Sequence, residues 1–343
     1  MSGRARPPRA AATLVGALLV AAALGACGGD DGPRSSGGSR DRDSPVTGGS
    51  TSPAPSAAPT AAVLCAGAVP APDRALVASL DLDEASGLAA SRRSPGVLWS
   101  HDDSGGAPEV FAIGPAGADL GAYALVGADA TDWEDMAIGP APGGGAGGPD
   151  RLYLADIGDN RSSRSSVTVY RAPEPAVAPL AVRDEDEVGG EIDGVEALAL
   201  AYADGPHDAE ALVADPVTGD LFVLTKEWLG APVGVYRIPA DIGPAAPVTM
   251  ARSGDAAVPP GELVTGADIS PDGALIAVRT YGMVLLWDRA PGESVPDALA
   301  RRPCRAPVEA EAQGEAVAIE PDGRGYVTVG EGRNPAINVF RLP

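Results

Sequence analysis

Acidic residues that could bind a cation recur along this chain at the start of short apolar segments. Residues 132–137 read DWEDMA, residues 208–212 read DAEAL and residues 314–317 read GEAV. Carboxylate oxygens are the ligands that Ca²⁺ and Mg²⁺ prefer, and clustered carboxylates need a cation, a shared proton or a basic residue to offset their charge. The alternative is that each acid caps a turn or accepts hydrogen bonds from backbone amides. The candidate metal ligands are Glu84, Glu134, Asp156, Glu210, Asp268 and Glu315.

A second set of polar residues lies mainly where later apolar segments end, as in residues 156–160, which read DIGDN. Acids and amides in such phrases could bind a small-molecule or polymer ligand beside a metal. The candidate ligand-binding residues are Asp102, Asp103, Asp135, Asp159, Asn160, Glu227 and Glu331.

Four basic or titratable residues are candidates for catalysis. Lys226 is the only lysine of the chain, and it could bind an anionic group or, with a lowered pKa, act as a base. Arg279 could hold the same anion. The only two histidines, His101 and His207, each lie near aspartate and could form an acid/base pair. The alternatives are an exposed lysine retained by chance and solvated histidines without a role in chemistry.

Five repeated units must position these residues. In each, an acidic or polar phrase opens a short strand, a Gly- or Pro-containing turn follows, and a second apolar strand runs into another polar phrase; the later turns span 215–219, 270–273 and 320–323. This repetition predicts an all-β fold, a β-propeller of five blades, with a divergent sixth as the alternative. In a propeller the openers and the ends of the second strands lie on one face, so we expect the acids to surround one mouth of the central channel. Residues 75–78 are a candidate strand for completing the last blade.

The N-terminal region predicts export. Three arginines precede an apolar run at residues 10–23, and residues 24–27 read LGAC, which resembles a bacterial lipobox. We expect a signal peptide at 1–26, a diacylglycerol and palmitate anchor on Cys27, a flexible Gly/Ser/Pro linker over 27–62 and the propeller over 63–343. The membrane is then a partner through the lipid, and the domain lies at the outer face of the cell membrane. The alternative is an ordinary secretory signal that is cleaved nearby.

The remaining cysteines, the net charge and the absence of common motifs limit the possible disulfides, partners and classes of site. Cys65 and Cys304 are a candidate disulfide in an exported protein, and two unpaired thiols are the alternative. The formal net charge of −22 disfavours nucleic acid as a partner. The chain contains no Gly-x-Ser-x-Gly, Walker or dinucleotide motif and no Cys-x-x-Cys pair, which disfavours the common hydrolase, nucleotide and zinc sites.

At 132–137, 156–160 and 208–212 the chain resembles a group of uncharacterised exported bacterial β-propeller lipoproteins, over about residues 80–333. The group is only distantly similar to phytase-like propellers, and that comparison implies calcium-dependent phosphate-ester chemistry without a catalytic motif that matches residue by residue. We therefore expect a lipid-anchored propeller that binds a ligand with a divalent cation, Ca²⁺ or Mg²⁺, at its acidic mouth. The alternatives are a metal-dependent hydrolase of phosphate or other esters, with Lys226 or Arg279 holding the anion, and a scaffold for another envelope protein.

Overall fold

The computed structural model describes residues 60–343 except 68–70, 79–81, 83, 104, 144–148, 178–188, 229 and 245. Residues 55–343 belong to one compact unit. The expected signal peptide, Cys27 and the linker as far as residue 59 lie outside the described residues. The described part is mostly β-structure, arranged in four hydrogen-bonded sheets.

The first sheet contains β2 (Ala85–Ala90), β3 (Leu98–Asp102), β4 (Glu109–Ile113), β5 (Asp119–Leu125) and β9 (Gly190–Ile192), in that order. Strands β2 to β5 form an antiparallel meander, with the 3₁₀-helix η1 (Pro115–Gly117) between β4 and β5. Strand β9 joins the outer edge in parallel with β5.

The second sheet has eight strands and combines two meanders. One consists of β6 (Trp133–Pro140), β7 (Asp150–Asp156), β8 (Val167–Pro173) and β10 (Glu196–Tyr202), and the other of β11 (Ala209–Ala214), β12 (Leu221–Thr225), β13 (Val233–Ile238) and β14 (Val248–Ala256). Their outermost strands, β10 and β14, pair in parallel. This pairing is why the five repeated units occupy four sheets.

The last two sheets have four strands each. One contains β15 (Val264–Ile269), β16 (Leu275–Thr280), β17 (Val284–Asp288) and β18 (Cys304–Ala306), with α2 (Val295–Leu299) before β18. The other contains β19 (Gly314–Ile319), β20 (Gly325–Gly330), β21 (Ala336–Arg341) and β1 (Asp73–Leu76). Strand β1 pairs with β21, so the prediction that an N-terminal strand completes the last unit is confirmed, with the strand two residues earlier than expected.

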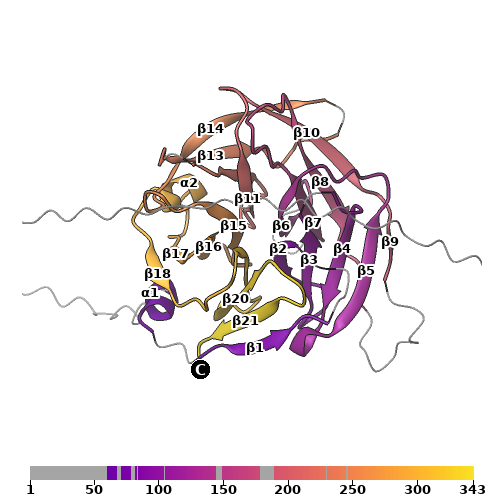
Figure 1. Ribbon diagram of the computed structural model, residues 1–343. Coiled ribbons are helices and arrows are strands. Elements are labelled where there is room, and N and C mark those ends of the chain that lie inside the picture. The colour runs from indigo at the N-terminus through magenta and orange to yellow at the C-terminus, as the bar shows by residue number, and fades with distance from the viewer. Residues whose placement is uncertain are drawn as a thin grey trace, which may run out of the picture. The chain divides into compact units, whose positions relative to one another are not determined.

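The first strands of the five units lie around a common centre. Strands β2, β6, β11, β15 and β19 contact one another in that order, and β19 also contacts β2 (Figure 1). Apolar side chains of neighbouring units pack together between the sheets. One such cluster contains Trp99 and Trp133, and another contains Trp287. Burial of these large side chains, at roughly 25 cal/mol per Å² of apolar surface, is the main force that holds the units together.

The Pro-Asp-Gly turns lie at one end of these first strands. Gly273 and Gly323 have φ values of 73° and 67°, which glycine adopts without strain. Asp272 accepts a hydrogen bond from the Ala274 amide at 3.0 Å, and Asp322 accepts one from the Arg324 amide at 2.9 Å. The tight turns predicted from the sequence are thus present.

The N-terminal helix α1 (Thr60–Cys65) is fixed by a disulfide between Cys65 and Cys304, whose Cα atoms are 6.0 Å apart. The predicted pairing is confirmed. A disulfide is typical of proteins outside the cytoplasm. In the part of the chain that the structure describes, every helix is too short to span a membrane.

Candidate functional site

A β-bulge in the first strand of each unit places the candidate acids. The strand register shifts at Glu134 in β6, Glu210 in β11 and Glu315 in β19. The same shift falls at Thr265 in β15 and at Ser86 and Gly87 in β2. A bulge inserts one residue and re-aims its side chain. The three glutamates at these positions, which we call the bulge glutamates, are only 4–5% exposed.

Hydroxyl groups take the place of glutamate in the other two units. The Ser86 hydroxyl donates to the Glu134 carbonyl oxygen at 2.7 Å, and the Thr265 hydroxyl donates to the Gly314 carbonyl oxygen at 3.0 Å. Thr265 was not among the sequence candidates. Its signal is the small residue that follows it, Gly266, just as Ala211 and Ala316 follow Glu210 and Glu315.

Lys226 is a buried cation that binds one of the bulge glutamates. Its ammonium forms a salt bridge with Glu210 and donates to the Tyr281 hydroxyl at 2.9 Å. It also lies 5.0 Å from the centre of the Tyr281 ring and 5.4 Å from that of Trp228. Burial alone would lower the pKa of Lys226, but attraction by Glu210 and the hydrogen bonds with Glu210 and Tyr281 outweigh it and raise the pKa. This direction is opposite to the lowered pKa that a lysine base would need.

The bulge glutamates have a strong affinity for protons. Burial, with repulsion from Glu210, raises the pKa of Glu315 to about 9. Burial and repulsion from Glu210, Asp103 and Asp132 raise the pKa of Glu134 well above its usual value. Burial also raises the pKa of Glu210 to about 7, although Lys226 opposes this change. Carboxyl groups in this state are poised to exchange protons for a cation.

Three acidic residues come close enough to hold a metal ion. Asp103, Asp132 and Glu134 each offer one oxygen, and these oxygens lie within 4.8 Å of one another. Asp103 follows β3, Asp132 precedes β6, and Glu134 is the bulge residue of β6. We call these three residues the acidic triad. Glu134 was a predicted metal ligand and Asp103 a predicted ligand-binding residue, whereas Asp132 was missed.

Gly158 leaves the space that the acidic triad needs. A Cβ atom at this position would lie 2.0 Å from Oε1 of Glu134 and 2.5 Å from Oδ2 of Asp132. Its amide also donates to the Asp132 carbonyl oxygen at 3.2 Å. The glycine of the DIGDN segment thus leaves room for the carboxylates of Glu134 and Asp132.

The two acidic residues of that segment accept hydrogen bonds from backbone amides. Asp156 accepts from the amides of Thr131 and Asp132 and from Arg164 at 2.7 Å. Asp159 accepts from the amides of Ser163 and Arg164, both at 2.6 Å. The structure thus gives the candidate metal ligand Asp156 an arginine partner, and it leaves Asn160 exposed.

Two further candidates connect the first strands within the centre. Asp135 accepts from the amides of Met136, Leu212 and Ala267 at 2.8–3.0 Å, which links β6, β11 and β15. Asp268 lies three residues beyond the bulge position of β15 and accepts from the amides of Ile269 and Ile319. Burial raises the pKa of Asp268 to about 6. Asp268 therefore does not share the bulge position of the glutamates with which the repeat pattern grouped it.

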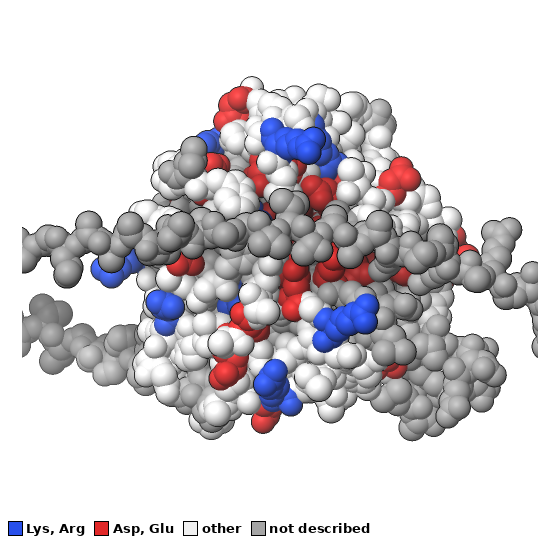
Figure 2. Space-filling view, viewed as in Figure 1, with Lys and Arg blue, Asp and Glu red and all other residues white. Residues whose placement is uncertain are grey.

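The remaining acidic candidates lie at the ends of β2, β3, β12 and β20. Asp102 accepts from the Glu84 amide at 3.1 Å, and Glu227 accepts from the Thr225 hydroxyl at 2.7 Å. Glu331 accepts from Gln313 at 2.7 Å, and burial and repulsion from Glu84 raise its pKa. Figure 2 shows acidic side chains gathered around the middle of this face of the protein.

Arg279 is buried inside the fold rather than exposed at its surface. It is 1% exposed and donates to Glu311 at 2.7 Å, and Glu311 in turn accepts from Thr328 and Asn338. This buried network holds the loop before β19 against the last sheet. Two other guanidinium nitrogens, Nε and Nη1, are buried without a hydrogen-bond partner, and the role of Arg279 in holding an anion stays a prediction.

The two histidines lie in different clusters. His101 is buried against Trp133, with the ring centres 5.5 Å apart, and its Nδ1 lies 2.9 Å from the Asp102 carbonyl oxygen. Burial lowers the pKa of His101 to about 4, so the ring is neutral at physiological pH. His207 instead contacts the Tyr236 hydroxyl at 2.8 Å and Asp204 at 3.1 Å. The two histidines thus contact different residues, and their role as an acid/base pair stays a prediction.

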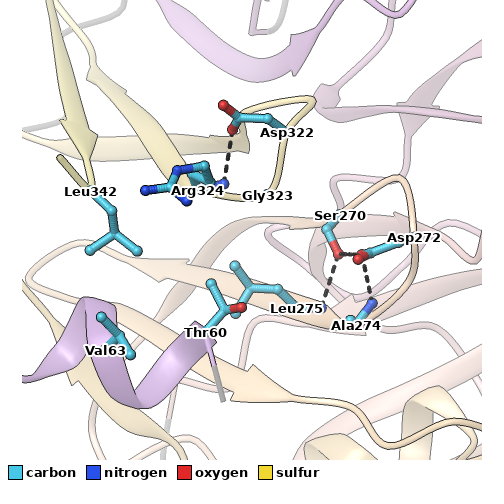
Figure 3. Close-up of a pocket in the computed structure, with 10 residues that line it drawn as sticks. All are labelled: Thr60, Val63, Ser270, Asp272, Ala274, Leu275, Asp322, Gly323, Arg324 and Leu342. Carbon is cyan, nitrogen blue, oxygen red and sulfur yellow. Dashed lines mark hydrogen bonds between the residues drawn. The ribbon is translucent and has the colours of Figure 1, made fainter. Parts of the chain in front are cut away.

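A cavity of about 240 Å³ lies at the other end of the first strands (Figure 3). Thr60 and Val63 of α1 line it, together with residues of the turns at 270–275 and 322–324. The carboxylates of Asp272 and Asp322 are bound to their own turns, as described above. The cavity is a seam between the N-terminal helix and these turns, and it is separate from the acidic triad.

The chain matches no protein-family model and no curated protein sequence. The assignment of a function therefore depends on the geometry of this site.

Proposed function

We propose that the protein is an exported five-bladed β-propeller, anchored by lipid on Cys27, that binds a divalent cation at the acidic triad and, beside it, a ligand at the acidic mouth. The observation that carries the proposal is the convergence of oxygens from Asp103, Asp132 and Glu134 within 4.8 Å of one another. The five first strands around one centre, and the completion of the last unit by β1, support the propeller arrangement.

Ca²⁺ is the cation that this site favours. Its ligands are all carboxylates, which are hard oxygen donors, and Ca²⁺ accepts irregular sets of such donors that water molecules complete. A cation would also relieve the repulsion between Glu134 and its neighbours Asp103 and Asp132. The same repulsion that favours protonation of Glu134 therefore also favours the binding of a metal ion beside it.

Binding, rather than ester hydrolysis, is the activity that we propose. A phosphate-ester hydrolase needs cationic groups that face the substrate, and here Lys226 and Arg279 are both engaged by buried glutamates. The disulfide between Cys65 and Cys304 supports the location outside the cytoplasm.

Thermal unfolding of the purified protein with Ca²⁺, with Mg²⁺ and with a chelator tests the cation site. Ligand at 100 times its Kd stabilises the folded state by about 2.7 kcal/mol, so Ca²⁺ should raise the Tm by several degrees. Asp132→Asn should abolish this rise, and the exposed Glu191→Gln in β9 is the matched control that should retain it. An equal rise in wild type and Asp132→Asn, or no rise in either, would refute the proposed site.

A further inference from the structure

Trp228 differs from the other tryptophans of the chain. It is 56% exposed, whereas Trp99, Trp133 and Trp287 are at most 2% exposed. Leaving so large an apolar ring in water forgoes the stabilisation that the other three provide. An exposed aromatic ring of this kind is available for a ligand.

The ring of Trp228 is held in place by Asp208 and lies close to Lys226. Trp228 follows β12 by three residues, close to Lys226 and Glu227, and its indole nitrogen lies 3.3 Å from Oδ2 of Asp208. The Lys226 ammonium lies 5.4 Å from the centre of the ring. Asp208 is in turn fixed, because its Oδ1 accepts from the Asp159 amide at 3.0 Å. The orientation of the ring is therefore established before any ligand binds.

The charges around Trp228 select the chemistry of that ligand. The carboxylates of Asp208, Glu210 and Glu227 repel an anion. A cation is disfavoured over the ring because the Lys226 ammonium is already close to it. What remains is a neutral molecule with an apolar face to stack on the indole and hydroxyl donors at its edge for the partly exposed carboxylate of Glu227. A sugar ring has both features.

We propose that Trp228 is the stacking platform for one ring of a neutral saccharide, whose hydroxyl groups donate hydrogen bonds to carboxylates of the mouth. This inference rests on the proposed function in that it names the class of ligand at the same mouth. The residues that carry it differ from the acidic triad, so the two can be tested separately.

Tryptophan fluorescence of the full chain in Ca²⁺ buffer provides the test, because the three buried tryptophans respond little to a surface ligand. The probes are cellohexaose, maltohexaose, mannohexaose and hexa-N-acetylchitohexaose, all of them neutral, with spermidine as a cationic comparison. We expect at least one hexasaccharide to shift the emission to shorter wavelength and to protect it from acrylamide. Trp228→Ala should weaken binding at least tenfold, whereas Trp228→Tyr should stay within about threefold of wild type, since tyrosine can stack.

Val217→Ala is the matched control, because Val217 is also exposed but lies in the turn at 215–219. It should bind the saccharide like wild type. A response to spermidine alone, no response to any hexasaccharide, or equal binding by wild type and Trp228→Ala would overturn the inference.

The Ca²⁺-dependent rise in Tm separates this inference from the proposed function. Trp228→Ala should keep the rise while losing the saccharide. Saccharide binding without a Ca²⁺ effect would refute only the cation site, and a Ca²⁺ effect without saccharide binding would refute only the platform.

Discussion

A Cβ atom on Gly158 would lie 2.0 Å from Oε1 of Glu134, so any other residue at this position would force the carboxylate away. Gly158→Ala should therefore destabilise the protein by about 1–3 kcal/mol and remove the Ca²⁺-dependent rise in Tm. Calorimetric titration with Ca²⁺ and thermal unfolding measure the two effects. Gly243→Ala is the control, because a Cβ there meets no atom within 4 Å. Retention of Ca²⁺ binding by Gly158→Ala would contradict the geometry of the triad.

The buried pair of Lys226 and Glu210 should be strongly coupled. Lys226→Met leaves Glu210 buried without its cation and should cost about 3 kcal/mol in the free energy of unfolding at pH 8. The double variant Lys226→Met/Glu210→Gln should recover part of this loss, because no lone carboxylate remains. Urea unfolding of both single variants and the double variant gives the coupling energy, and simple additivity of the two changes would contradict the pairing.

The stability of the metal-free protein should fall as the pH rises through the neutral range. The folded state raises the pKa of Glu315 from 4.5 to about 9, so the folded state binds this proton more tightly than the unfolded state does. The resulting stabilisation is fully present below about pH 4.5 and is lost as the pH rises to about 9. Urea unfolding in chelator between pH 6 and pH 9 should show a loss of about 1–3 kcal/mol.

Glu315→Gln isolates this contribution, because glutamine has a similar shape and does not titrate. The variant should be less sensitive to pH than wild type over the same range. An identical pH dependence in the two proteins would show that Glu315 does not hold the proton in the folded state.

Loss of the disulfide should weaken the attachment of the N-terminal helix. The bridge joins residues 239 positions apart. Its removal in Cys65→Ser should lower the free energy of unfolding by about 2–4 kcal/mol, because the unfolded chain gains conformational entropy. Cys304→Ser and the double variant should lose the same amount, measured by urea unfolding without reductant. A larger loss in the double variant than in either single one would show that the thiols matter beyond the bond.

Much of the chain's organisation could be predicted from local patterns. Turn chemistry at residues 270–273 and 320–323 marks where strands reverse, and strands of alternating or continuous apolar residues follow from periodicity. The pairing of Cys65 with Cys304 was expected for the two cysteines of an exported protein, and the strand near the N-terminus that was expected to complete the last unit is β1. These features depend on residues that are close together in sequence or on one topological rule.

The candidate site was harder to predict because a bulge of one residue decides which side chain faces the centre. Asp268 matched the acidic phrases by type, but the register of β15 places Thr265 at the bulge instead. Asp156 was predicted to be a metal ligand, but in the structure its carboxylate accepts a hydrogen bond from Arg164, eight residues later. Asp132 belongs to the triad because the segment before β6 lies close to the segment after β3. No spacing in the sequence indicates this proximity.

The pairing of β1 with β21 places residues from near the two ends of the chain in one sheet. The last sheet therefore cannot be completed until residues 336–341 have been synthesised and are free to pair with residues 73–76. The Cys65–Cys304 bond adds a second, covalent link of the same kind, because it joins α1 to β18 in the neighbouring sheet and forms only where thiols can be oxidised.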